Sequence, residues 1–183
     1  MTKSARPAPI HHLSLQVHEI AQLFNSMDPT PFLNKDLDPE AEAFIETWAS
    51  GFAPRSRFHI TIHVEQWPSD CDPSEMLTEA IHNHFSHKAE RTRSALKHFL
   101  RQGRMSLVIG LVFVTLCLLA ADAIGNLGTH TGTIIARESL TIVGWVAMWR
   151  PLQIFLYDWW PLQRQIRLYQ QLGNAHVRVI KGK

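Results

Sequence analysis

The sequence predicts a small cytosolic α/β domain, with two to three strands plus helices, combined with a two-helix transmembrane hairpin. Three observations predict this class. Residues 12–18 and 57–65 alternate apolar and polar side chains with the period of a half-buried strand. Residues 105–121 form an uninterrupted run of 17 uncharged, mainly apolar residues, which is close to the length that crosses a bilayer. The third observation is the distribution of charge.

The charge of the chain is near neutral only as a total. Its 183 residues include 18 Lys and Arg and 16 Asp and Glu. Residues 1–72 hold 5 basic and 10 acidic side chains, residues 73–104 hold 6 and 3, and residues 139–183 hold 6 and 1. This distribution indicates an acidic soluble part, an apolar hairpin and basic flanks. The 45% hydrophobic content excludes a disordered chain, and two cysteines cannot by themselves form a disulfide framework or a four-thiolate metal site.

Residues 1–72 are expected to form the cytosolic α/β part. A short helix follows the first strand at residues 19–25. Asp38 is placed to cap a second helix with Pro39 at its first position, and Gly51 is placed to end it. The side chains of this helix that recur at helical spacing, and are expected to face the core, are Ala41, Phe44, Ile45 and Trp48.

A long amphipathic, basic helix is expected over residues 73–104. It begins at Pro73 with Asp72 as its cap, and neither Pro nor Gly interrupts it before Gly103. It continues directly into the first span, so that one helix runs from the cytosol into the membrane. Its apolar face, which must pack on something, consists of Leu77, Ile81, Phe85, Leu96, Phe99 and Leu100.

The first span covers residues 105–124, and the second covers residues 133–150 after an outer loop at residues 125–132. The second span has two possible placements. Either it runs from residue 134 to 149 with Arg137 and Arg150 near the two interfaces, or it starts at Ser139 and carries Arg150 deeper. The first placement is preferred, because an arginine near a helix end reaches the headgroups whereas an unpaired one at the centre is costly.

Aromatic and basic side chains near the spans are expected at the membrane interfaces, where such residues concentrate. They are Arg104, Trp145, Trp149, Arg150, Tyr157, Trp159 and Trp160. Asp122 and Arg137 are expected at similar depth near the outer surface. There they either form an ion pair or face headgroups and water separately.

Basic residues flank the hairpin on the side of both termini. Five of them precede the first span between residues 91 and 104, and Arg164 and Arg167 follow the second, whereas only Arg137 lies between the spans. The bias of Lys and Arg towards the cytoplasmic side therefore predicts that both termini are cytoplasmic.

Residues 151–183 are expected to return to the cytosolic side as interfacial and amphipathic helices and a short strand. Residues 151–160 are predicted to turn along the membrane surface, and residues 161–172 to form an amphipathic helix that Gly173 ends. Residues 176–180 alternate like a strand, which we expect to share a sheet with the two earlier strands.

Histidine is the residue type whose pattern most suggests chemistry, since the chain has 11. The candidate metal ligands are His59, His63, His82, His84 and His87. A solvated polar face is favoured over a zinc site, because three or four ligands must converge and the long helix lacks the His-Glu-x-x-His signature. A pH response is a third hypothesis.

Other catalytic signatures are absent from the sequence. It contains no glycine-rich phosphate loop, nucleophile elbow or paired-cysteine motif, so we predict neither a catalytic residue nor a cofactor. The basic residues at 88–104 are expected to touch anionic lipid headgroups rather than nucleic acid, because they adjoin a span.

Two stretches of the chain resemble a group of bacterial two-span inner-membrane proteins. They are QLFNSMDPTPFLNKDLDPEAEAFIETWA and WRPLQIFLYDWWPLQRQIRLYQQL. The resemblance covers most of the chain. It implies a multi-pass protein of the bacterial inner membrane, and it transfers no catalytic residue, since no activity is assigned to that group.

The sequence favours a non-enzymatic accessory or scaffold protein that forms a homo-oligomer or docks a cytosolic or membrane partner. The long apolar face on residues 73–104 and the small sheet motivate this hypothesis, because two or three strands are marginally stable alone. The first alternative is a subunit of an oligomeric channel or transporter. The second is a membrane-attached metal-dependent enzyme that uses the histidine clusters.

Overall fold

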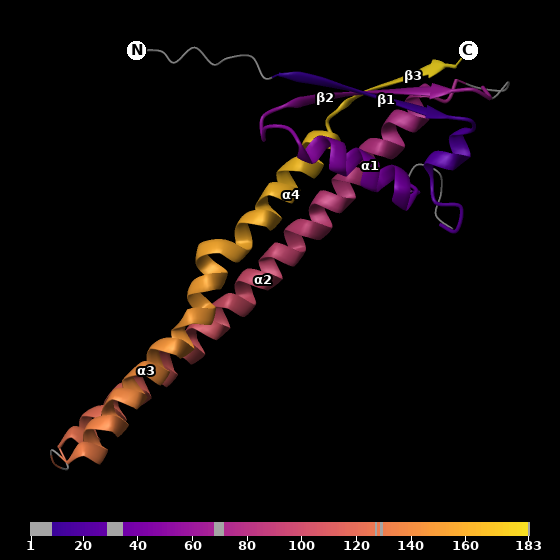
Figure 1. Cartoon of the computed structure of the whole chain (residues 1–183). Helices are drawn as coiled ribbons and strands as arrows, with labels where there is room; N and C mark the ends of the chain where they lie inside the picture. The colour runs from indigo at the N-terminus through magenta and orange to yellow at the C-terminus, as the bar shows by residue number, and fades with distance from the viewer. Residues whose placement is uncertain (1–8, 29–34, 68–71, 127, 129, 183) are drawn as a thin grey trace, which may run out of the picture. The chain divides into compact units, whose positions relative to one another are not determined.

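The structure is a computed structural model that describes residues 9–28, 35–67, 72–126, 128 and 130–182 (Figure 1). Its described residues group into two compact units. One unit, here the α/β unit, comprises Met1–Thr92 and Arg164–Lys183. The other, here the helical unit, comprises Arg93–Gln163. The α/β unit is therefore built from chain segments that precede and follow the helical unit.

The α/β unit contains a three-stranded parallel sheet. Its strands are β1 (Ile10–Val17), β2 (Arg57–Val64) and β3 (His176–Lys181), in the spatial order β1-β2-β3. β2 pairs in parallel with both neighbours. The prediction that the C-terminal strand shares a sheet with the two N-terminal strands is confirmed, with strand ends shifted by at most a few residues.

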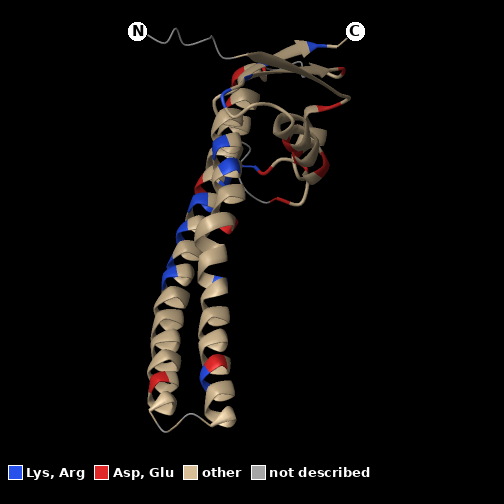
Figure 2. Cartoon of the chain, turned by 60° about the vertical axis from the view of Figure 1, so that its left-hand side comes forward, with Lys and Arg blue, Asp and Glu red and all other residues tan. Residues whose placement is uncertain are grey.

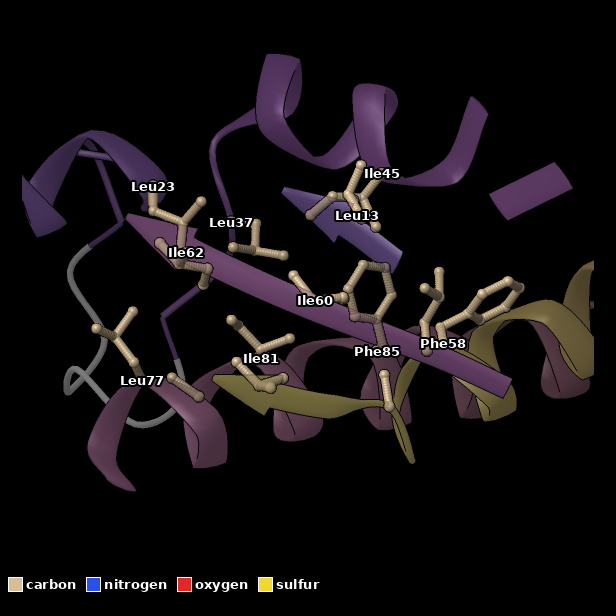
Figure 3. Close-up of a cluster of buried hydrophobic side chains, with 14 of the residues drawn as sticks. Leu13, Leu23, Leu37, Ile45, Phe58, Ile60, Ile62, Leu77, Ile81 and Phe85 are labelled. Carbon is tan, nitrogen blue, oxygen red and sulfur yellow. The ribbon is translucent and has the colours of Figure 1, made fainter. Parts of the chain in front are cut away.

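Helices cover one face of this sheet. On β2 the inward side chains are Phe58, Ile60, Ile62 and Val64, and each is at most 2% exposed. Leu77, Ile81 and Phe85 of α2 (Ser74–Gly125) are buried in the same core (Figure 3). The first half of the apolar face predicted on the long helix therefore packs on the protein's own sheet and needs no external partner. Burial of each such side chain contributes about 1.5–3 kcal/mol.

The short elements of the N-terminal segment follow the local sequence. A 3₁₀-helix, η1 (Ile20–Leu23), follows β1, and α1 (Pro39–Ser50) begins where Asp38 accepts hydrogen bonds from the backbone N–H groups of Glu40 at 2.9 Å and Ala41 at 3.5 Å. The prediction of the buried face of α1 is wrong at one position. Phe44 is 55% exposed, because the helix turns Ile45 and Ala49 into the core instead.

The helical unit holds the two apolar segments. Within the described residues, two helices are long and apolar enough to cross a membrane, and they span Ser74–Gly125 and Thr131–Leu172. In α2 no charged residue lies between Arg104 and Asp122 (Figure 2).

The second long helix has three parts. α3 (Thr131–Gln153) passes through a π-helical segment, η3 (Ile154–Asp158), into α4 (Trp159–Leu172). The separate helix expected after Pro151 is thus part of one continuous helix. Pro151 lies inside α3 and is buried, and the wider π turn that follows accommodates the change in helical phase.

Glycines bring α2 and α3 close together in the helical unit. A Cβ atom on Gly144 of α3 would lie 3.1 Å from Cγ2 of Val114 and 3.2 Å from Cβ of Cys117. A Cβ atom on Gly110 of α2 would lie 3.2 Å from Sδ of Met148. Small residues allow this approach, which is a common way for helices to pack in a membrane.

Candidate functional site

The sheet has one open face, which carries its polar side chains. On β1 the exposed residues of this face include His12, Ser14 and Gln16, and on β3 they include His176 and Arg178. Parallel sheets are usually covered on both faces. Among the described residues, the helices α1, α2 and α4 contribute to a core on one face only. In the described part of the chain, the other face of the sheet is therefore not covered by a helix.

Three histidines lie side by side across this open face. His12, His59 and His176 are register partners on the three strands. The ring centroids of His12 and His59 are 5.0 Å apart, and those of His59 and His176 are 5.1 Å apart. Desolvation lowers the pKa of His59, and the charges of His12, His176 and Arg57 lower it further. Protonation of the middle ring is thus disfavoured.

The two outer strands of the sheet differ in charge. β1 contains no Lys, Arg, Asp or Glu in its eight residues, whereas the six residues of β3 include Arg178 and Lys181. Within the described part of the chain, neither strand has a hydrogen-bonded neighbour on its outer side. Charged residues on an edge strand hinder pairing with another chain. β1 is therefore the edge that is open to pairing.

A partly buried polar cluster joins α1, α2 and α4 beneath the sheet. Lys88 of α2 contacts the carboxylates of Glu42 and Glu46 of α1. The hydroxyl of Tyr169 of α4 donates to Glu46 at 3.4 Å, and the Lys88 ammonium lies 5.0 Å from the Tyr169 ring centroid. The contacts combine ion-pair, hydrogen-bond and cation–π interactions across three helices. They indicate a structural junction.

Burial changes the ionisation of this cluster. Burial raises the pKa of the Glu46 carboxyl, and the hydrogen bond from Tyr169 partly opposes this rise. It lowers the pKa of Lys88, while the charge of Asp36 acts in the opposite direction. Burial, together with the charge of Glu46 and the hydrogen bond to it, raises the pKa of Tyr169 to about 12.

His84 of α2 lies at the edge of the same cluster and is 8% exposed. Its Nδ1 is 3.1 Å from Oδ1 of Asp36 and 3.3 Å from the backbone nitrogen of Leu37, and its Nε2 is 3.6 Å from Oε2 of Glu42. Nδ1 accepts from Leu37 when unprotonated and donates to Asp36 when protonated, so the two contacts are alternatives. Burial lowers the pKa of His84, and Asp36 partly restores it.

The five predicted metal-ligand candidates occupy separate places. His59 and His63 lie on the sheet's open face, His82 bonds through Nε2 to the Ala175 carbonyl at 2.8 Å, His84 is buried, and His87 is exposed. In the part of the chain that the structure describes, no three His, Cys, Asp or Glu side chains are arranged to hold a metal ion. His12 and His176 were missed because strand register cannot be read from spacing along the chain.

The predicted membrane-interface residues lie in the helical unit and are mostly exposed there. The exposed fractions of Trp145, Trp149, Tyr157 and Trp160 are 68%, 72%, 70% and 67%. Arg104 and Arg150 are also exposed, and Trp159 is half-buried with its indole N–H bonded to the Phe155 carbonyl at 2.8 Å. Arg150 Nη1 lies 4.0 Å from Oδ2 of Asp158.

Asp122 and Arg137 lie on α2 and α3. No ion pair within 4.0 Å joins them among the described residues. The Arg137 side chain lies instead beside Gly125, with Nη1 3.7 Å from the position of a Cβ atom there.

Comparison of the chain with protein-family models, curated proteins and solved structures finds no match. The candidate function therefore rests on the geometry of the two units.

Proposed function

We propose that the protein is a non-enzymatic membrane scaffold whose α/β unit binds a second copy of the chain through β1. The single observation that carries the proposal is the outer edge of β1, which pairs with no other strand among the described residues, is eight residues long and has no charged side chain. Such an edge is a template for backbone pairing unless charge or a covering segment blocks it.

The helical hairpin supports a membrane location for this scaffold. Its two helices are long and apolar enough to cross a membrane. The α/β unit contains chain that precedes the hairpin and chain that follows it. If both helices cross the membrane, the chain after the hairpin returns to the same side of the membrane as the chain before it. The basic flanks support a cytoplasmic location for that side, and the resemblance described above supports a location in the bacterial inner membrane. Both termini are then cytoplasmic.

Pairing of β1 with β1 of a second copy suits the symmetry of a dimer. Two identical edges related by a two-fold axis pair in antiparallel fashion. Each β1 edge is then occupied, so the assembly stops at two copies. The combined sheet is twice as wide as the original, which relieves the marginal stability of three strands. The charges of β3 disfavour the same pairing at the other edge.

Cysteine cross-linking tests the choice of edge. Ser14 on β1 and Arg178 on β3 are both exposed on the open face, and both are register partners of Thr61. In a background with Cys71→Ser and Cys117→Ala, we expect Ser14→Cys to give covalent dimers with a short bifunctional maleimide. The matched variant Arg178→Cys should remain uncross-linked.

The oligomeric state provides a second measurement. Native mass spectrometry of the protein in detergent or nanodiscs should show a dimer. A strictly monomeric protein would contradict the proposal as a whole, and efficient cross-linking of Arg178→Cys alone would contradict the assignment to β1.

A further inference from the structure

A polar pocket of about 580 Å³ lies at the amino ends of β2 and β3 in the α/β unit. Its walls come from the loop before β2, the start of both strands and the last turns of α4. The functional side chains that line it are Ser56, Arg57, His59, Arg167, Gln170 and His176. None of the described residues that line it is acidic. The pocket is separate from the outer edge of β1.

The pocket concentrates positive charge. Arg57 and Arg167 reach it from β2 and α4, and among the described residues neither forms an ion pair with a carboxylate. His59 and His176 are adjacent, with ring centroids 5.1 Å apart. The carbonyl end of α4 opposes an anion with about half an elementary charge. The two full positive charges of Arg57 and Arg167 outweigh this partial negative charge.

Ser56 gives an independent sign that a ligand belongs here. This residue is 3% exposed, and its buried hydroxyl has no hydrogen-bond partner in the part of the chain that the structure describes. Buried polar groups are almost always paired, so an orphaned one calls for an explanation. A hydroxyl donates to an anionic oxygen, and Ser56 is among the residues that line the same pocket as the two arginines.

The walls of the pocket are held in place by other side chains. Gln171 of α4 donates to the Pro54 carbonyl in the loop before β2, and Arg164 donates to the Ser50 carbonyl at 3.2 Å. Asn174 donates to the Gln170 carbonyl at 2.6 Å, which satisfies one of the last carbonyl groups of α4. The pocket is thus formed before a ligand enters, which limits the entropy lost on binding.

We infer that this pocket binds a small organic phosphate ester, with its phosphate group between Arg57 and Arg167. Guanidinium groups match the geometry of phosphate oxygens, and imidazoles and the Ser56 hydroxyl add donors for the remaining ones. The volume exceeds that of a bare phosphate and leaves room for an organic group. A soluble ester and a lipid headgroup share this chemistry.

Binding of glycerol 3-phosphate tests the inference. The full-length protein is placed in phosphatidylcholine nanodiscs at fixed ionic strength, and binding is measured by calorimetry. We expect saturable binding that Arg57→Gln and Arg167→Gln each weaken by about tenfold or more. Arg178→Gln is the matched control, because it removes one charge from the same sheet without touching the pocket.

Ser56→Ala separates binding from folding. It should weaken glycerol 3-phosphate binding severalfold and leave the thermal midpoint of the free protein unchanged or higher, because it removes an unpaired buried hydroxyl. A short-chain phosphatidic acid is the second probe. If phosphatidic acid binds with the same dependence on the two arginines and glycerol 3-phosphate does not bind, the ligand is a lipid headgroup. If glycerol 3-phosphate binds and phosphatidic acid does not, the ligand is a soluble ester.

Two results would overturn the inference. One is the absence of saturable binding with either probe. The other is an equal loss of affinity in Arg178→Gln and in the two pocket variants. That result would mean that the ligand is attracted by the overall positive charge and not by the pocket. Neither result bears on pairing through β1, which depends on a different edge of the sheet.

Discussion

The hydroxyl of Tyr169 on α4 donates a hydrogen bond to the Glu46 carboxylate on α1 at 3.4 Å, although 123 residues separate them. The helical unit lies between them in the chain. This contact therefore links the segment that follows the hairpin to the segment that precedes it, in a partly buried setting.

The ionisation of Tyr169 reports directly on this contact. Its pKa is raised to about 12 by burial, by the charge of Glu46 and by the hydrogen bond. The chain has two tyrosines, so in a Tyr157→Phe variant the near-ultraviolet absorbance of phenolate belongs to Tyr169 alone. We expect a titration midpoint near 12. A midpoint at the ordinary value of about 10 would show that the contact is not formed.

The same shift predicts how stability changes in alkali. Above about pH 10 the unfolded state loses the Tyr169 proton while the folded state keeps it. The free energy of unfolding should therefore fall between about pH 10 and 12. In Tyr169→Phe this part of the fall should vanish, and stability near neutral pH should drop by about 1 kcal/mol for the lost hydrogen bond. Chemical denaturation of the two proteins at matched pH measures both effects.

His84 is expected to be neutral near pH 7, since burial lowers its pKa. Below about pH 6.5 the unfolded state gains this proton before the folded state does, so stability should fall as the pH falls. Asp36→Asn removes the charge that raises the His84 pKa and should lower the pKa further, whereas Arg91→Gln should raise it. NMR titration of labelled histidine checks the two opposite shifts. Equal shifts in the same direction would contradict the structure.

The histidine row should respond to its own members. Because His12 and His176 lower the pKa of His59, His12→Gln and His176→Gln are each expected to raise it. The same NMR titration measures this. His63→Gln is the control, since His63 lies on the same strand but does not act on His59, and it should leave the titration of His59 unchanged.

Helix packing in the helical unit should depend on Gly144. Gly144→Leu forces a side chain into space that Val114 and Cys117 already fill, and overpacking of this kind costs about 1–3 kcal/mol. Gly132→Leu on the same helix is the control, because no atom of the described residues lies within 4 Å of a Cβ atom there. Thermal unfolding in detergent should show a lower midpoint for Gly144→Leu only. Equal midpoints would mean that the two helices do not pack at Gly144.

Local sequence patterns predicted most individual elements. The Asp38-Pro39 pair located the start of α1, and alternation over residues 57–65 located β2, because caps and strand periodicity depend on neighbouring residues. Phe44 was misplaced for the opposite reason. Several residues of α1 fit an apolar face, and only packing against the sheet decides which of them turn inward.

The sequence by itself determined the two apolar helices, the capped helices, the three strands and the separation of charge, since each depends on residues close together in the chain. Only the tertiary structure decided that His12, His59 and His176 are neighbours, that Leu77, Ile81 and Phe85 are covered by the sheet, and that one pocket collects Ser56, Arg57 and Arg167. Strand register and helix docking join residues that are far apart along the chain. Such contacts depend on long-range packing energy, which local periodicity does not contain.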